Sequence, residues 1–179
     1  MEPPCPGCGY SYTALERAEI APGLRSAAAA YGAILGTDVG QLREHRRSDI
    51  WSPLEYAGHV RDVYRTQESR VLQACAEDEP DFPSMLRQER VRELSYNTQE
   101  PAVVAAEIVA SADSLAVVLE GLDEAAWERT GVYNWPVTLV RTVDWIGRHT
   151  VHESLHHFQD MDRLLRTGTT EDLITTEGG

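Results

Sequence analysis

Apolar residues recur with the period of an α-helix in four long stretches of this sequence. These stretches predict helices over residues 22–35, 53–76, 101–120 and 138–165. No run of alternating Val, Ile and Thr is convincing, which predicts that strands are absent or trivial. Four helices of this length, with one long connection between the second and the third, predict an all-α four-helix bundle.

The start of the second helix has the clearest local signal. Ser52 can cap the helix, Pro53 suits its first position, and the Glu55 side chain can bond back to the Ser52 N–H. Trp51, just before the cap, is predicted to pack on Tyr56 as a hydrophobic staple. The sequence therefore predicts a capping box at this helix end.

These elements divide the chain into three segments. Residues 1–20 form an N-terminal tail with a C-x-x-C motif, residues 21–166 form the bundle, and residues 167–179, rich in Thr and Gly, are predicted to be a flexible C-terminal tail. In the long connection, an acidic break over residues 77–81 ends the second helix. A short helix is predicted near residues 85–94.

The chain is strongly acidic. Its 179 residues suit one domain, with 16 Lys and Arg against 29 Asp and Glu, a formal net charge of −13. Such a charge disfavours nucleic acid as a partner. The one basic cluster, Arg43, Arg46 and Arg47, is interpreted as a solvated loop in preference to a grip on an anionic substrate.

The sequence also predicts where the protein resides. The first residues carry no basic region and no apolar run, so no secretory signal is expected. The longest weakly polar stretch, residues 27–35, is shorter than the roughly 20 residues of a membrane span. Three cysteines, an odd number, do not form a disulfide framework. We therefore expect a cytoplasmic protein without membrane association.

Histidines are concentrated on the fourth predicted helix. His149, His152 and His156 share one face, and His157 points about a quarter-turn away. The i, i+4 spacing of His152 and His156 lets two imidazoles converge on one metal ion. A third ligand must come from another helix, and His59 in the second helix is the natural candidate.

Packing alone is the alternative explanation for these histidines. A lone histidine is usually a core or rim residue, as we expect for His45, and an i, i+4 pair by itself leaves a metal site no better than even. His149 could replace His152 as a ligand or act as an outer donor. Glu153 and Asp160 lie on the same helix and could orient the imidazoles, which favours the metal site.

The N-terminal tail carries a second candidate for metal chemistry. The run from Cys5 to Gly9, CPGCG, is half of a zinc knuckle, in which small residues let two thiolates reach one ion. The other half is missing, because Cys75 stands alone in the second helix and is expected to be a small buried residue. A redox pair, or a clip completed by a histidine such as His45, is an alternative. We favour two free thiols.

Residues 51–62, WSPLEYAGHVRD, together with residues 152–157, HESLHH, resemble the DinB-like superfamily of four-helix bundles. The resemblance covers residues 20–166. In that family a histidine of the second helix and an H-x-x-x-H or E-x-x-x-H pair of the last helix hold a divalent metal ion with open positions. The resemblance implies that His59, His152 and His156 are the ligands of a Zn or Ni ion.

The superfamily includes mycothiol-dependent maleylpyruvate isomerases and bacterial thiol S-transferases. The resemblance therefore implies an enzyme that uses its metal to activate a low-molecular-weight thiol, mycothiol, for attack on an electrophilic small molecule. Relatives are often dimers, so it also implies a homodimer. Two alternatives stay open, namely a non-catalytic metal-binding stress-response bundle and a metal-assisted hydrolase with Glu153 as the base.

Overall fold

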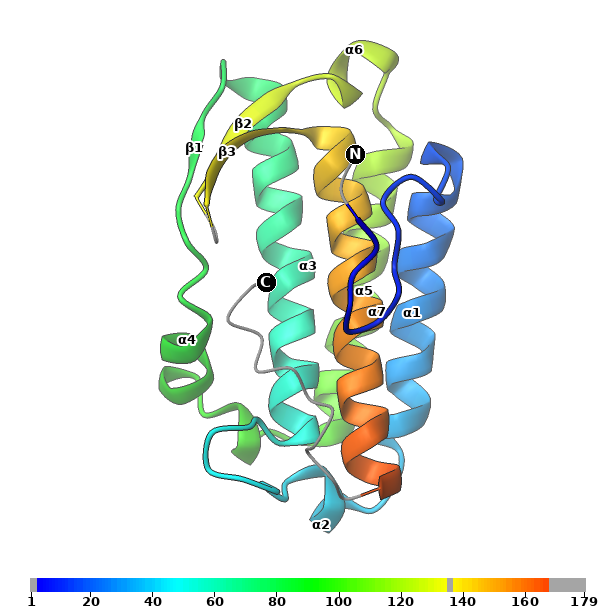
Figure 1. Cartoon of the computed structure of the whole chain (residues 1–179), viewed down its shortest axis with the longest axis vertical. Helices are drawn as coiled ribbons and strands as arrows, with labels where there is room; N and C mark the ends of the chain where they lie inside the picture. Colours follow the sequence, from blue (N-terminus) through cyan, green and yellow to red (C-terminus); the bar gives the residue numbers. More distant parts are fainter. Residues whose placement is uncertain (1–2, 135–136, 168–179) are drawn as a thin grey trace.

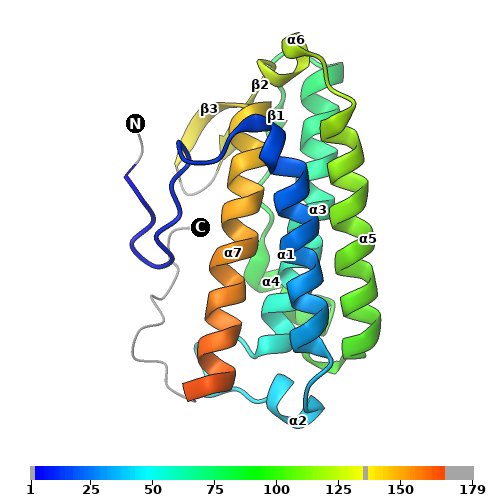
Figure 2. The ribbon, with the colours of Figure 1, turned by 90° about the vertical axis from the view of Figure 1, so that its right-hand side faces the viewer.

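The computed structural model describes residues 3–134 and 137–167. In that part of the chain four long helices lie side by side: α1 (Ile20–Leu35), α3 (Pro53–Ala76), α5 (Pro101–Glu120) and α7 (Val143–Thr167). α1 and α7 run in one direction and α3 and α5 in the other (Figure 1). α1 and α3 each pack against both α5 and α7, so α1 and α3 occupy opposite corners (Figure 2). The predicted four-helix bundle is confirmed.

The connections carry the short helices. In chain order these are η1 (Arg17–Glu19), α2 (Val39–Leu42), α4 (Arg87–Glu93), η2 (Tyr96–Thr98) and α6 (Glu124–Trp127). Because α3 and α5 run in the same direction, the connection between them returns along the length of the bundle (Figure 1). The long second connection and the short helix predicted within it are therefore confirmed. Residues 168–179, nearly all of the predicted flexible tail, lie outside the described residues.

A small sheet at one end of the bundle corrects the prediction that strands are absent or trivial. β1 (Asp81–Phe82) pairs in parallel with β2 (Thr130–Asn134), and β2 pairs antiparallel with β3 (Thr138–Thr142). The last long helix consequently begins at Val143 and not at Thr138.

The pattern of burial explains why the strands were missed. The two buried positions of β2 are Gly131 and Tyr133, and glycine has no side chain to contribute an apolar signal. β3 is largely exposed and shows no alternation, and β1 has only two residues. Alternation of apolar and polar residues is the main sequence signature of a strand, and neither β2, whose burial alternates, nor β3 displays it.

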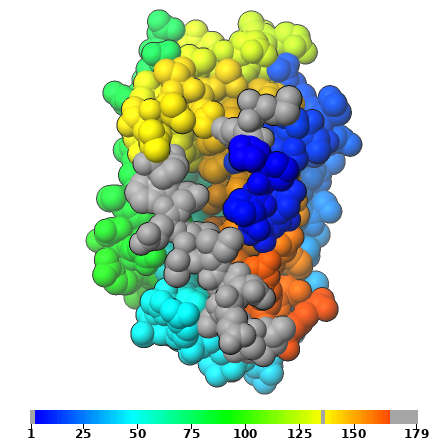
Figure 3. Space-filling view, viewed as in Figure 1, coloured from blue at the N-terminus to red at the C-terminus, as the bar shows by residue number. Residues whose placement is uncertain are grey.

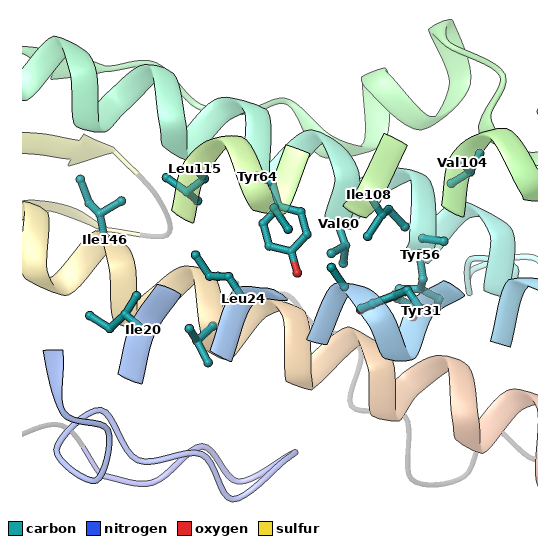
Figure 4. Close-up of a cluster of buried hydrophobic side chains, with 14 of the residues drawn as sticks. Ile20, Leu24, Tyr31, Tyr56, Val60, Tyr64, Val104, Ile108, Leu115 and Ile146 are labelled. Carbon is teal, nitrogen blue, oxygen red and sulfur yellow. The ribbon is translucent and has the colours of Figure 1, made fainter. Parts of the chain in front are cut away.

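The space between the four helices is filled by large buried side chains. Figure 4 shows Leu24 and Tyr31 of α1 facing Tyr64 of α3 in this core. Inside it, the Tyr31 hydroxyl donates a hydrogen bond to the backbone carbonyl of Ser154 at 2.8 Å. A buried hydroxyl needs such a partner, so this bond also connects α1 to α7.

α5 contains the most apolar long stretch among the described helices, and by length and composition alone it could cross a membrane. It is longer than residues 27–35, which the sequence analysis took as the longest such stretch. In the bundle, one side of α5 contributes to the core the buried residues Val104, Ile108, Leu115 and Leu119. Its exposed Asp113 and Glu120 form ion pairs with Arg25 of α1.

The start of α3 confirms the predicted capping box. Ser52 Oγ accepts a hydrogen bond from the Glu55 N–H at 3.2 Å, and the Glu55 carboxylate accepts one from the Ser52 N–H at 2.8 Å. The rings of Trp51 and Tyr56 pack with centroids 5.3 Å apart, as the staple predicts. The Ser52 hydroxyl also donates to Asn97 Oδ1 at 2.7 Å, which ties the long connection to the helix start.

Tyr96, also in the long connection, packs closely on α3. A Cβ atom at Gly58 would lie only 2.9 Å from its ring, so the helix needs glycine there. The Tyr96 hydroxyl donates to Asp62, and the Arg61 guanidinium lies over the ring at 5.3 Å from its centroid. Residues 51–62 therefore form the surface on which the returning connection docks.

We predict that Ser52→Ala lowers the free energy of unfolding by about 1 kcal/mol, because the helix loses its cap. Denaturant unfolding followed by circular dichroism measures the change. Ser69→Ala, at an exposed position further along α3, is the control and should leave the midpoint nearly unchanged. Equal midpoints for the two variants would show that the cap contributes nothing.

We predict that Gly58→Ala destabilises the protein by about 1–3 kcal/mol, because the new methyl group overlaps the Tyr96 ring. Gly32→Ala in α1 is the control, since no atom lies within 4 Å of its new Cβ. There the usual preference of a helix for alanine should raise the stability by about 1 kcal/mol. Changes of the same sign in both variants would contradict the close contact.

Candidate metal centre

Two clusters of potential metal ligands lie on adjacent sides of α7. Residues four apart share a side of a helix, and consecutive residues are turned by about 100°. Glu153 and His157 consequently face one side, and His152 and His156 face the next. The first pair joins His59 of α3, and the second joins two cysteines of the N-terminal segment; within each cluster the ligand atoms lie within 4.8 Å of one another.

The first cluster, formed by His59, Glu153 and His157, is buried. Glu153 Oε2 lies 3.5 Å from His157 Nε2 and 3.9 Å from His59 Nε2. His59 Nε2 is buried and has no hydrogen-bond partner among the described residues. Buried polar atoms normally have a partner. This nitrogen therefore has a lone pair available for an ion at the centre of the cluster.

Surrounding side chains hold the two imidazoles in place. His157 Nδ1 lies 3.1 Å from Asp160 Oδ2, which leaves its Nε2 facing Glu153. The Trp51 ring packs on His59 with centroids 5.1 Å apart. A carboxylate on the far nitrogen of a histidine is a common way to orient a metal-binding imidazole.

Burial and charge set the protonation of this cluster. Burial lowers the pKa of His59 to about 4, so its imidazole is neutral near neutral pH. Burial acts to raise the pKa of Glu153, but contacts with His157 and His59 outweigh it and hold that pKa well below its usual range. Burial likewise opposes charge on His157, yet Asp160 and Glu153 raise its pKa to about 9. His59 and Glu153 are thus in the forms that bind metal.

The buried cluster borders a cavity of about 290 Å³. His59 and Glu153 contribute to its wall, together with His149 of α7. The rest of the lining comes from α3, β2 and the long connection, and includes Val63, Arg70, Met85, Leu86 and Tyr133. A small molecule in this cavity would therefore lie beside the candidate ligands.

Arg70 is a charged cavity residue that sequence analysis missed. Its guanidinium lies over the Tyr133 ring, 4.5 Å from the centroid, and donates to the Pro83 carbonyl at 2.6 Å. Only the folded connection and β2, which no local pattern predicted, bring these partners to α3. The result is a fixed positive charge in the wall of the cavity.

The basic cluster that sequence analysis singled out contacts its own loop and the long connection. Arg46 pairs with Glu44 at 2.8 Å, and Arg47 pairs with Asp49 at 2.6 Å. Arg43 donates to the Gln99 carbonyl at 3.0 Å. The contacts of Arg46 and Arg47 agree with the interpretation of a solvated loop, whereas half-buried Arg43 joins this loop to the long connection.

The structure does not bring the three sequence-predicted ligands together. His59 belongs to the buried cluster, whereas His152 and His156 belong to the second one, and no group of potential ligands within the described ranges contains all three. α7 contains two pairs of potential ligands at i, i+4 spacing, His152/His156 and Glu153/His157, which are offset from each other by one residue. Only the second pair faces α3, and it has the E-x-x-x-H form of the family pattern. Glu153, expected to orient the imidazoles or, in the hydrolase alternative, to act as the base, therefore lies among the potential ligands.

Cys5 and Cys8 are not joined by a disulfide, but other expectations about the cysteines are corrected. Cys5 and Cys8 lie beside His152 and His156, whereas His45, considered as their partner, bonds Glu55 at 2.6 Å. Cys75 is exposed, so the prediction of a buried residue is wrong. Burial raises the pKa of the Cys8 thiol to about 11.

Two solved structures have the same fold. YfiT from Bacillus subtilis, described as a probable metal-dependent hydrolase with an unusual four-helix bundle topology, aligns with a TM-score of 0.70 and 16% identity over 82% of this chain and 86% of its own. A mycothiol-dependent maleylpyruvate isomerase aligns with a TM-score of 0.68 and 17% identity over 85% of this chain. The alignment spans 63% of the isomerase chain. At these identities the likeness establishes the fold.

Sequence comparison identifies the family. The search of curated proteins finds no match. The profile described as the DinB superfamily matches residues 24–161, well over half of the chain. The chain belongs to the DinB superfamily.

Proposed function

We propose that this protein is a metal-dependent enzyme in which His59, Glu153 and His157 hold one divalent ion beside the cavity. The observation that carries the proposal is the buried, unpartnered Nε2 of His59 in the cavity wall, facing a carboxylate and a second imidazole. Two histidines and one glutamate are a donor set of catalytic zinc sites, which leave a position open. The similar YfiT, described as a probable metal-dependent hydrolase, supports this assignment.

We further propose that the reaction is the transfer of a low-molecular-weight thiol, mycothiol, to an electrophilic small molecule. When bound, a zinc or nickel ion supplies Lewis acidity, which favours the thiolate form of a thiol. A thiol has an ordinary pKa of about 8.5 against about 15.7 for water, so it is the more easily ionised of the two nucleophiles. The similarity to a mycothiol-dependent isomerase supports the choice of thiol.

The chain's own residues define what the cavity accepts. Arg70 supplies a fixed positive charge, which suits an anionic group on the thiol or on the electrophile. Val63, Met85 and Leu86 contribute apolar surface to the wall, beside polar side chains such as Gln67 and Gln88. A volume of about 290 Å³ is at the small end of ligand sites, so we propose a small, anionic electrophile.

A hydrolase is the second candidate, and one observation favours it. The donor set of two histidines and a glutamate is that of the hydrolases thermolysin and carboxypeptidase A. In this reaction water takes the place of the thiol. Because this proposal makes Glu153 a ligand, a base would have to come from another residue of the cavity. His149, whose Nε2 lies 3.9 Å from the Glu153 carboxylate, is the imidazole of the cavity wall that is not a proposed ligand of this ion.

We predict that His59→Gln removes one divalent ion per chain, because it takes away the ligand that α3 contributes. Metal analysis of purified protein, with circular dichroism to verify folding, measures the loss. The control is His45→Gln, a histidine that belongs to no cluster of potential ligands in the described structure. An unchanged metal content in folded His59→Gln would overturn the assignment.

We predict that the metal-loaded protein accelerates conjugation of mycothiol to a bimane halide, and that Glu153→Gln and His157→Gln each reduce the acceleration by about 100-fold or more. The ligand set predicted from sequence does not contain His157, so the loss in His157→Gln decides between the two sets. Ester hydrolysis without added thiol would indicate the hydrolase. Neither activity with any bacterial thiol would indicate the non-catalytic bundle.

A further inference from the structure

The N-terminal segment, residues 3–16, is fixed against the outer side of α7. Figures 1 and 2 show it running beside this helix, and Figure 3 shows it covering part of the helix surface. The Tyr10 hydroxyl donates to the Arg148 carbonyl at 2.9 Å, and Arg163 Nη2 donates to the Gly7 carbonyl at 2.9 Å. The segment therefore has a defined course that the predicted tail did not suggest.

The C-x-x-C motif forms a tight loop within this segment. The Gly9 N–H donates to the Cys5 carbonyl, and the Cys5 N–H donates to the Tyr10 carbonyl, both at 2.8 Å. Gly9 has φ +74°, a conformation that glycine adopts without strain. The loop places the sulfur atoms of Cys5 and Cys8 within 4.8 Å of each other and of one nitrogen each from His152 and His156.

The distance between Cys5 and His156 has the value that a shared zinc ion requires. Cys5 Sγ lies 3.6 Å from His156 Nδ1. Zn–S bonds of about 2.3 Å and Zn–N bonds of about 2.0–2.1 Å at a tetrahedral angle place the two donor atoms about 3.6 Å apart. The two atoms are thus spaced as two corners of a zinc tetrahedron.

Neighbouring groups prepare both histidines as ligands. Tyr12 Oη lies 3.1 Å from His152 Nδ1, and His152 Nε2 is buried without a hydrogen-bond partner in the described residues. Asp160 Oδ2 lies 3.6 Å from His156 Nε2, on the nitrogen away from Cys5. Each imidazole therefore has an oxygen near one ring nitrogen, and its other ring nitrogen is available to bind a metal ion, as in metal-binding histidines.

We propose that Cys5, Cys8, His152 and His156 bind a second ion, a structural zinc that attaches the N-terminal segment to α7. Two cysteines and two histidines are a closed donor set of structural zinc sites, which leave no position for substrate. Two thiolates balance the charge of Zn²⁺, so the half-buried site has no net charge. It shares no ligand with the site at His59, and the proposal does not depend on the proposed function.

The test is the zinc content of the full-length protein, purified under reducing conditions without chelator. We expect the double variant C5S/C8S to hold one zinc ion fewer per chain than the wild type. Cys75→Ser, the same substitution at an exposed cysteine away from the segment, is the control and should lose none. His59→Gln separates the two sites, because it should keep the cysteine-dependent zinc. Equal zinc in C5S/C8S and the wild type would overturn the proposal.

Cobalt substitution gives a second readout that needs no destabilised variant. The Co²⁺-loaded wild type should show thiolate-to-cobalt charge-transfer absorption in the near ultraviolet and strong tetrahedral bands in the visible. His59→Gln should retain the charge-transfer absorption. Its absence from the wild type would overturn the proposal, as would alkylation and mass spectrometry showing that Cys5 and Cys8 form a disulfide in the isolated protein.

Discussion

The burial of one carboxylate, Glu153, is the constraint on which the centre of this bundle depends. An ionised carboxylate inside a protein costs several kcal/mol unless positive charge or hydrogen-bond donors surround it. His59, His149 and His157 surround Glu153, with nitrogens 3.5–3.9 Å from its oxygens. These histidines come from α3 and α7, so the packing of the two helices determines which groups surround the carboxylate. A protonated imidazole or a bound cation would balance the negative charge of Glu153, and the unpartnered nitrogen of His59 favours a bound cation.

Asp160 connects the two sides of α7. One of its oxygens lies 3.1 Å from Nδ1 of His157 and 3.6 Å from Nε2 of His156. The two imidazoles belong to different clusters, yet the same carboxylate orients both. Because a carboxylate on the far nitrogen makes an imidazole a better donor, Asp160 supports both proposed ions at once. The adjacent i, i+4 pairs of the helix are therefore coupled, although they share no ligand.

Local signals predicted most of the fold and part of the site. Ser52, Glu55 and the apolar periodicity determine where helices begin and which sides they bury, and these are properties of neighbouring residues. The choice between the pairs 152/156 and 153/157 depends on how α7 is rotated against α3, which no local pattern contains. The meeting of Cys5 with His156 joins residues 151 positions apart, and only the folded N-terminal segment produces it. The sheet was hidden because Gly131 has no side chain to mark the buried side of β2.

Tyr12 links the N-terminal segment to the cavity. Its hydroxyl lies 2.7 Å from Nδ1 of His149, a cavity residue, and 3.1 Å from Nδ1 of His152, a proposed zinc ligand. The Tyr12 ring also stacks on Trp145, with centroids 5.9 Å apart. A segment fixed at Cys5 and Cys8 would thus hold Tyr12 against the imidazole that borders Glu153. The order of the segment and the position of His149 in the cavity wall are consequently coupled. The proposed zinc ion, although outside the cavity, would therefore help to fix the shape of the cavity wall.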